Sequence, residues 1–226
     1  MVFESTILNQ REIALGTHEV TFKRPADFTF RAGQHMQVAV QELLYSDSKG
    51  GSRLFSIASS PNNLEELRVI FRLSGSGFKE TLRSLSIGTI VKLEQASGSF
   101  LLPQKLTRPH VFIAGGVGIS PFMSYLNKNT QDTLDQSITL YYGNQNPQSA
   151  AYIRELTLMD TQQKNFSLEE VYKRPVKELF LKIAARHVEA IWWIVGPPPM
   201  VALTVDGLLA GGVPMEQIHT ESFEGY

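Results

Sequence analysis

The pattern of hydrophobic and polar positions changes near the middle of the chain. Up to about residue 100, short segments of strand-like pattern are separated by turns rich in Gly, Pro, Asn and Asp. The segments are EVTFKRP, HMQVAVQEL, RLFSIASS, ELRVIFRL and TIVKLEQA, and one short helical stretch, FKETLRSL, precedes the last of them. Closely spaced strands with few helices predict an antiparallel barrel or sandwich.

After about Pro103, apolar runs alternate with segments of helical period. The predicted strands are HVFIAG, SITLYYGN, NFSLEEVY and AIWWIVG, and the predicted helices are ISPFMSYLNK, SAAYIRELTLM, KELFLKIAARH and VALTVDGLLAGG. This alternation predicts a parallel sheet covered by helices on both faces. We therefore expect a two-domain β + α/β protein, with an antiparallel β-barrel domain over residues 1–104 and a parallel-sheet α/β domain over residues 105–226.

Composition excludes several classes of function. Hydrophobic residues make up 42% and charged residues 19% of the 226 residues, which is typical of a globular protein. Because Lys and Arg total 21 against 22 Asp and Glu, with no long basic run, we do not expect a nucleic-acid partner. The absence of cysteine excludes disulfides, a thiolate nucleophile and cysteine-held iron–sulfur clusters. The five histidines show no metal-ligand spacing, so no metal site is expected.

The N-terminal sequence MVFESTILNQRE lacks the basic start and apolar run of a signal peptide. The longest apolar stretches, such as AIWWIVGPPPMVAL, are short and interrupted by proline. We expect a cytoplasmic protein without a membrane span.

Two loops of the predicted parallel sheet have unusual sequences. In AGGVGISP, Gly116 and Gly118 allow a sharp turn and close approach of a ligand, and the helix that follows offers free N–H groups to a phosphate. Pro121 suits the first turn of that helix. Taken alone, these glycines are better explained as a simple turn. In VGPPPMV, we expect three consecutive prolines to form a stiff, extended exit from a strand, which places Gly196 and Met200 at the same sheet edge.

The barrel half contains a third candidate, GSRLFSIASSP. Strand alternation puts Arg53 and Phe55 on one side and Leu54 and Ser56 on the other. An arginine pairs with a diphosphate, an aromatic ring stacks on a ring system, and a serine hydrogen-bonds a ring nitrogen. In isolation, such a set more often consists of a surface arginine beside core side chains. Further along, GSGFKETL resembles a second anion-binding helix start.

Together these pieces resemble the ferredoxin–NADP reductase family of flavoproteins. Residues 53–56 resemble the R-x-[YF]-S flavin motif, residues 116–121 the G-x-G-x-x-P nucleotide loop, and residues 196–200 the G-P-P-x-M part of C-G-P-P-x-M. The segments FRAGQHM, ASGSFLLP, YYGN and ESFEGY also match, in the expected order over nearly the whole chain.

The resemblance implies an FAD-binding barrel joined to an NAD(P)H-binding α/β domain, with hydride transfer to flavin N5 and onward delivery of electrons. It implies that Arg53 holds the FAD diphosphate, Phe55 stacks on or lines the isoalloxazine, and Ser56 lies near N5 as a catalytic candidate. The other positions implied beside the flavin are Leu54, Ile70, Phe71, Arg72, Gly77, Phe78 and Lys79. Those implied for the pyridine nucleotide are Gly116, Gly118, Ile119, Ser120, Pro121, Gly196, Pro197 and Met200.

At the C-terminus, the resemblance implies that Phe223 or Tyr226 covers the flavin until nicotinamide displaces it. Glu221 is the second catalytic candidate, as a proton source or a local field. Val195 stands where many members have cysteine, so any catalytic contribution of that thiol is absent. Two other departures bear on the nucleotide. Val117 stands where NADP-using members often have threonine, and Gln145 stands where an arginine is frequent, which weakens the case for NADP over NAD. Lys164, Lys173 and Arg174 are alternative sources of positive charge.

The acceptor of the electrons stays open at this point. A separate ferredoxin, flavodoxin, or oxygenase or haem component is expected, and a free-flavin or quinone reductase is the alternative. A hypothesis of another class is a regulatory module that binds pyridine nucleotide without turnover.

Overall fold

The computed structural model describes residues 1–103, 105–127, 136–172 and 175–223, and it divides the chain into two compact units. The first unit contains residues 1–102 together with helix α2 (Ser120–Leu126). The second unit contains residues 103–119 and the described chain from residue 136 onward. Of the predicted helices after Pro103, α2 is therefore the one that groups with the first unit.

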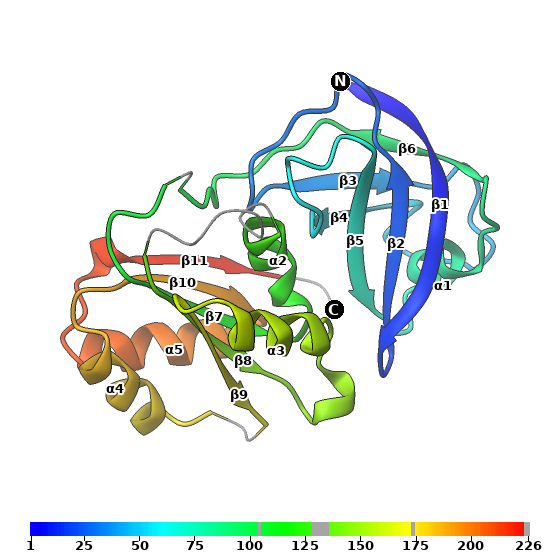
Figure 1. The fold of residues 1–226 in the computed structure, drawn as a ribbon. Helices are drawn as coiled ribbons and strands as arrows, with labels where there is room; N and C mark the ends of the chain where they lie inside the picture. Colours follow the sequence, from blue (N-terminus) through cyan, green and yellow to red (C-terminus); the bar gives the residue numbers. More distant parts are fainter. Residues whose placement is uncertain (104, 128–135, 173–174, 224–226) are drawn as a thin grey trace. The chain divides into compact units, whose positions relative to one another are not determined.

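The first unit is built on a six-stranded antiparallel sheet (Figure 1). Its strands are β1 (Val2–Ala14), β2 (Thr17–Lys23), β3 (His35–Ala39), β4 (Ser52–Ser56), β5 (Glu66–Arg72) and β6 (Ile90–Glu94), in the order β4-β3-β6-β1-β2-β5. An isolated antiparallel bridge joins Ile57, next to the edge strand β4, to Val69 of the other edge strand β5. The two edges of the sheet thus meet, as expected for a barrel.

The barrel encloses an aromatic-rich core. Its fully buried large side chains include Phe22, Phe28, Met36, Phe71, Phe78 and Leu67. Helix α1 (Gly77–Ser84) contributes Phe78 and Leu82 to this core and begins at Ser76, whose hydroxyl caps the Lys79 N–H. The start of α1 is therefore anchored by burial on one side and by a cap on the other.

Strand β1 did not follow from the sequence pattern. Its 13 residues are interrupted by two register shifts, between Ile7 and Asn9 and between Glu12 and Ala14. Such irregularities break the alternation that marks a strand. They leave Asn9, Gln10 and Glu12 in a polar run that reads as a loop.

The second unit contains a five-stranded parallel sheet. Its strands are β7 (His110–Gly115), β8 (Ile138–Gly143), β9 (Phe166–Val171), β10 (Ile191–Gly196) and β11 (Ile218–Ser222), in the order β11-β10-β7-β8-β9. Helices α3 (Ile153–Gln162), α4 (Lys177–Arg186) and α5 (Pro198–Ala210) connect them. The antiparallel and parallel sheets confirm the expected fold class. The short edge strand β11 was not predicted, because only Ile218 in it is buried.

The strand order places a topological switch in the second unit. The chain runs from β7 outward through β8 to β9, and then returns to β10 on the other side of β7. With right-handed crossovers, α3 covers one face, and α4 and α5, which lie side by side in Figure 1, cover the other. Ligands of open parallel sheets bind beyond the carboxyl ends of the strands at such a switch.

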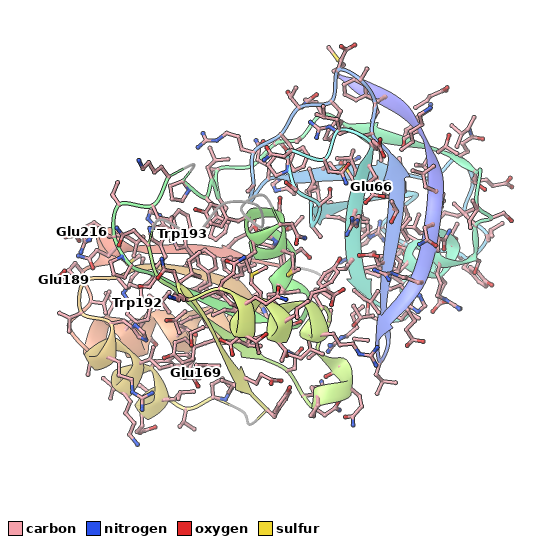
Figure 2. The ribbon with its side chains drawn as sticks, viewed as in Figure 1. Glu66, Glu169, Glu189, Trp192, Trp193 and Glu216 are labelled. Atoms are coloured by element: carbon pink, nitrogen blue, oxygen red, sulfur yellow. The ribbon has the colours of Figure 1, made fainter. Side chains whose placement is uncertain are left out.

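Trp192 and Trp193, adjacent on β10 and labelled in Figure 2, lie on opposite faces of this sheet. Trp192 is fully buried in a cluster with Phe180 and Leu208. Trp193 stacks on His219 at 4.2 Å between ring centroids, and its Nε1 donates a 2.8 Å hydrogen bond to Nδ1 of His110.

Within the described residues, no helix is both long and apolar enough to cross a bilayer.

Candidate functional site

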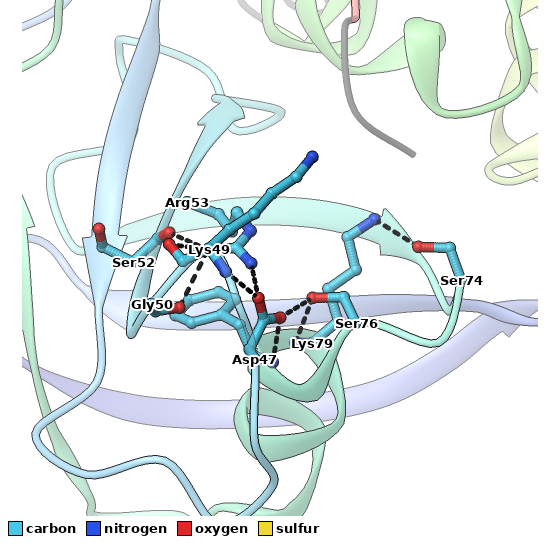
Figure 3. Close-up of polar contacts among 9 residues, drawn as sticks. Asp47, Lys49, Gly50, Ser52, Arg53, Ser74, Ser76 and Lys79 are labelled. Carbon is cyan, nitrogen blue, oxygen red and sulfur yellow. Dashed lines mark hydrogen bonds and ion pairs between the residues drawn. The ribbon is translucent and has the colours of Figure 1, made fainter.

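Arg53 lies on β4 and organises the turn before it (Figure 3). Its side chain is only 17% exposed, and one terminal nitrogen pairs with the Asp47 carboxylate. The other terminal nitrogen donates to the carbonyls of Lys49, Gly50 and Ser52, at 3.0, 3.0 and 2.6 Å. The guanidinium is thus held in place by the chain itself.

Asp47 lies at the start of α1, where it gathers several donors. Its Oδ2 accepts from the Phe78 N–H at 2.9 Å and from the Ser76 hydroxyl at 2.7 Å, and its Oδ1 accepts from the Lys49 N–H at 2.8 Å. These bonds, led by that of Phe78, hold the pKa of the Asp47 carboxyl well below its usual range. The start of α1 is therefore an anion-binding position.

Lys79 adds a buried positive charge beside this position. Its side chain donates from Nζ to the Ser74 hydroxyl at 3.2 Å (Figure 3), and the residue is 5% exposed. Burial, assisted by the charges of Arg53 and Lys49, lowers the pKa of Lys79 to about 8. Three cationic side chains and a single carboxylate, that of Asp47, make up this cluster. Such a donor set fits a multiply charged anion such as a diphosphate.

The remaining residues of the R-x-F-S segment have different environments. Phe55 is 7% exposed and packs in the barrel core, with its ring 6.1 Å from that of Phe78 and 5.7 Å from that of Phe71. Leu54 is 60% exposed. The Ser56 hydroxyl is buried and has no hydrogen-bond partner among the described residues. A buried hydroxyl without a partner is unusual and fits a ligand atom.

On β5, Ile70 and Phe71 are both buried, 4% and 1% exposed, and Arg72 ends the strand at the border of the core. The ring of Phe71 also stacks on His18 at 6.1 Å. The first unit therefore brings the sequence-predicted residues of β4, β5 and the start of α1 together, with the aromatic members inside the core.

In the second unit, the glycine loop follows β7 as a single 3-10 turn, Gly116–Ile119. Gly116 has a φ of +56°, which favours glycine, and its carbonyl accepts from the Tyr142 hydroxyl at 3.2 Å. A Cβ on Gly118 would lie 2.4 Å from the carbonyl oxygen of Val195 on β10. These glycines therefore make the turn and let the loop approach the neighbouring strand. Ile119, Ser120 and Pro121 follow as buried residues.

The second loop differs from its prediction. The structure contradicts an extended exit over all three prolines, because α5 already begins at Pro198 and only Pro197 is extended. The physical reason is that the first N–H groups of a helix have no intrahelical partner, so Pro198 and Pro199 lose no hydrogen bond there. The proline ring also fixes φ at a helical value.

This early helix start brings Met200 back toward the strand ends. A Cβ on Gly196 would lie 3.0 Å from the Met200 Cε, and one on Gly115 would lie 2.4 Å from its Sδ and 3.1 Å from Pro197. Since Val195 pairs with Ala114 in register, both loops leave the sheet at the switch between β7 and β10. The expectation that the two loops share one sheet edge is met.

The C-terminal segment reaches the same edge. Glu221 lies opposite Val195 in the β10–β11 register, and the Phe223 N–H donates to the Gly196 carbonyl at 3.2 Å. Tyr226, Lys173 and Arg174 lie outside the described residues. Gln145 and Lys164 are exposed.

Comparison with known proteins agrees with this geometry. Residues 112–206 match the sequence model described as the oxidoreductase NAD-binding domain. The structure superimposes on a ferredoxin NADP+ reductase from Neisseria gonorrhoeae, solved with bound FAD and NADP, with a TM-score of 0.81, 22% identity and coverage of 98% of each chain. The chain thus shares the fold of this reductase, and residues 112–206 match the NAD-binding domain of oxidoreductases.

Relatives of this reductase-like chain include larger proteins. It is 28% identical to the reductase component of propane 2-monooxygenase from Rhodococcus jostii, over 88% of this chain and 57% of that protein. It is 26% identical to a flavohemoprotein from Xylella fastidiosa, over 77% of this chain and 47% of the relative. The chain thus spans about half the length of these relatives.

Two residues with notable environments were not predicted from the sequence. Both polar atoms of the Asn144 amide are buried without a partner in the described part of the chain, directly after β8. In the sequence, Asn144 was marked only by its place at the end of YYGN, one of the segments that resemble the family. Asp47 carried no signal, because the SDSKGG segment reads as an ordinary turn.

Proposed function

We propose that the chain is an FAD-dependent oxidoreductase that takes a hydride from NAD(P)H onto flavin N5 and passes electrons to a separate acceptor. The observation that carries the proposal is the cationic cluster at the start of α1 combined with the Ser56 hydroxyl of the same unit, which is buried and has no hydrogen-bond partner among the described residues. A diphosphate and a ring nitrogen require these two kinds of partner. Relatives that are reductase components of oxygenases support the reaction class.

The chain's own groups suit the parts of the cofactor. Arg53, Lys79 and the Phe78 N–H bind the diphosphate, and the Ser56 hydroxyl donates to a ring nitrogen. Phe55 packs in the core and stiffens β4, the strand that carries Arg53 and Ser56. When bound, the flavin supplies the two-electron to one-electron conversion. In the second unit, Gly116, Gly118, Gly196, Pro197 and Met200 shape the nucleotide position, and Glu221 supplies a proton or a local field.

The experiment is rapid mixing of the FAD-reconstituted protein with NADH and, separately, with NADPH. We expect the flavin absorbance near 450 nm to bleach with at least one nucleotide, and the ratio of the two rates to give the nucleotide preference. Protein that takes up no FAD contradicts the proposal. Protein that holds FAD and binds nucleotide without bleaching is instead a regulatory module.

One observation favours a second candidate, a reductase that uses flavin as a dissociable substrate. Asp47 already engages Arg53, the Ser76 hydroxyl and the Phe78 N–H of α1, which would weaken retention of FAD. Steady-state NADH oxidation with FAD, FMN and riboflavin separates the two functions. The rate of a free-flavin reductase rises to saturation with the concentration of each of the three flavins, whereas a flavoprotein reaches its full rate with one equivalent of FAD.

A further inference from the structure

The Asp47 carboxylate occupies the donors that an incoming phosphate group would use. It takes the Phe78 N–H, the Ser76 hydroxyl and one end of the Arg53 guanidinium (Figure 3). Carboxylate and phosphate oxygens favour the same charge-assisted donors at a helix start. Asp47 is thus an internal anion in a position whose chemistry suits a diphosphate.

The turn that carries Asp47 is fixed to α1 by its backbone. The N–H groups of Leu44 and Tyr45 donate to the hydroxyl of the fully buried Thr81, at 3.0 and 3.2 Å. A Cβ on Gly77 would lie only 2.1 Å from the Ser46 carbonyl oxygen, so the turn lies directly against the helix. This placement keeps the carboxylate at a high effective concentration at its donors.

The charges of the cluster allow a stronger anion to replace this one. The positive charges of Arg53, Lys49 and the buried Lys79 act on this position, to which Asp47 supplies one negative charge. A diphosphate carries more negative charge and more acceptor oxygens than one carboxylate. The exchange therefore costs the Asp47 contacts and gains those of the phosphates.

We propose that Asp47 is a specificity-determining residue that competes with the diphosphate of FAD for these donors. The inference rests on the proposed function. Asp47 lowers the affinity for ligands that contain the diphosphate, namely FAD and ADP, and leaves riboflavin unaffected.

The test measures dissociation constants of Asp47→Asn and Asp47→Ser for FAD, ADP and riboflavin by calorimetry and flavin fluorescence. Both variants keep a polar side chain that can cap α1 while removing the charge. We expect FAD and ADP to bind at least about tenfold more tightly, and the constant for riboflavin to change less than about twofold. Asp27→Asn, which removes an exposed carboxylate from the same unit, is the matched control and should change none of them.

The outcomes separate the inference from the proposed function. Unchanged or weaker FAD binding in both variants, with FAD binding intact in the unaltered protein, overturns the competition and makes Asp47 a positioning residue for Arg53. Absence of FAD binding in the unaltered protein overturns the proposed function, and the inference with it.

A measurement on the unaltered protein guards against variants that fail to fold. Displacement of the carboxylate frees the Lys49 N–H, whereas the phosphates keep the Phe78 N–H bonded. We expect hydrogen exchange at Lys49 to accelerate on addition of ADP, while Phe78 stays protected. Equal or greater protection at both amides overturns the proposal.

Discussion

A single arginine illustrates how much structural and ligand-binding work one side chain can combine. Arg53 donates to three carbonyls of the turn before β4, pairs with Asp47, and lies over the Phe78 ring at 5.4 Å. Because these contacts fix the guanidinium before any ligand arrives, little side-chain entropy is lost on binding an anion. The same contacts mean that Arg53 also holds its own turn in shape.

The change Arg53→Ala removes both roles. We expect FAD affinity to fall by at least about tenfold, because the diphosphate loses a cationic hydrogen-bond donor, and the melting temperature of the first unit to fall by a few degrees. Fluorescence titration with FAD and differential scanning calorimetry measure the two effects. Arg83→Ala is the matched control, since Arg83 lies on the same helix as Phe78 and forms an ion pair with Glu80 one turn away. Full FAD occupancy at unchanged affinity in Arg53→Ala would contradict the assignment.

Residue roles were harder to predict from the sequence than residue positions. Arg53, Phe55 and Ser56 were predicted from their side-chain chemistry and from the resemblance of their segment to a flavin motif, and strand alternation assigned their sides. Phe55 lies in the core, and the Ser56 hydroxyl has no hydrogen-bond partner among the described residues. Alternation tells which residues share a side, but it does not tell which side a core fills. Asp47 was not predicted because two of its partners, Ser76 and Phe78, lie about 30 residues away at the start of α1, and only the fold brings them together.

At the scale of elements, the strands with regular apolar patterns were predictable and the irregular ones were not. β7 and β10 are continuous apolar runs and were recognised. β1 was hidden by its two register shifts, and β11 by having one buried residue. The shared edge of the glycine and proline loops followed from a general rule of parallel sheets. The early start of α5 did not, because three prolines suit an extended segment and a first helical turn equally well.

The contact between the glycine loop and β10 supplies a prediction at this scale. In Gly118→Ala the new Cβ meets the Val195 backbone, which cannot rotate away, so the loop or the strand must shift. We expect the free energy of unfolding of the second unit to fall by about 1–3 kcal/mol, as for other overpacked sites, together with weaker nucleotide binding.

Urea unfolding and NADH titration measure these two effects. Gly143→Ala is the matched control on the adjacent strand β8, because its Cβ would lie at an ordinary 3.5 Å from the Ala114 carbonyl oxygen. Equal stability of the two variants would show that the loop does not need a glycine at residue 118.

At the scale of the whole molecule, the two units have separate cores and can be followed by separate probes. Both tryptophans of the chain, Trp192 and Trp193, lie on β10 in the second unit. Tryptophan emission therefore reports on the second unit, while bound flavin would report on the first. Acid is a perturbation that should separate them, because a buried histidine lies against one of these tryptophans.

His110 is 4% exposed and accepts the Trp193 Nε1–H at its Nδ1, so the folded state requires its neutral form. Burial, together with the charges of His219 and Arg108, lowers the pKa of His110 from 6.5 to about 4. Between these values the unfolded chain binds more protons than the folded one. The stabilisation is therefore complete above pH 6.5, is lost progressively as the pH falls, and levels off below pH 4.

A shift of this size corresponds to about 3 kcal/mol of unfolding free energy. We expect the urea midpoint followed by tryptophan emission to fall between pH 6.5 and pH 4. His110→Gln, which retains an acceptor for Trp193 and cannot titrate in this range, should flatten that fall. His35→Gln, in the first unit, should leave it unchanged. The same loss of stability in the unaltered protein, His110→Gln and His35→Gln would assign the acid sensitivity to groups other than His110. Of the two substitutions, only His110→Gln removes the imidazole that must stay neutral in the folded state.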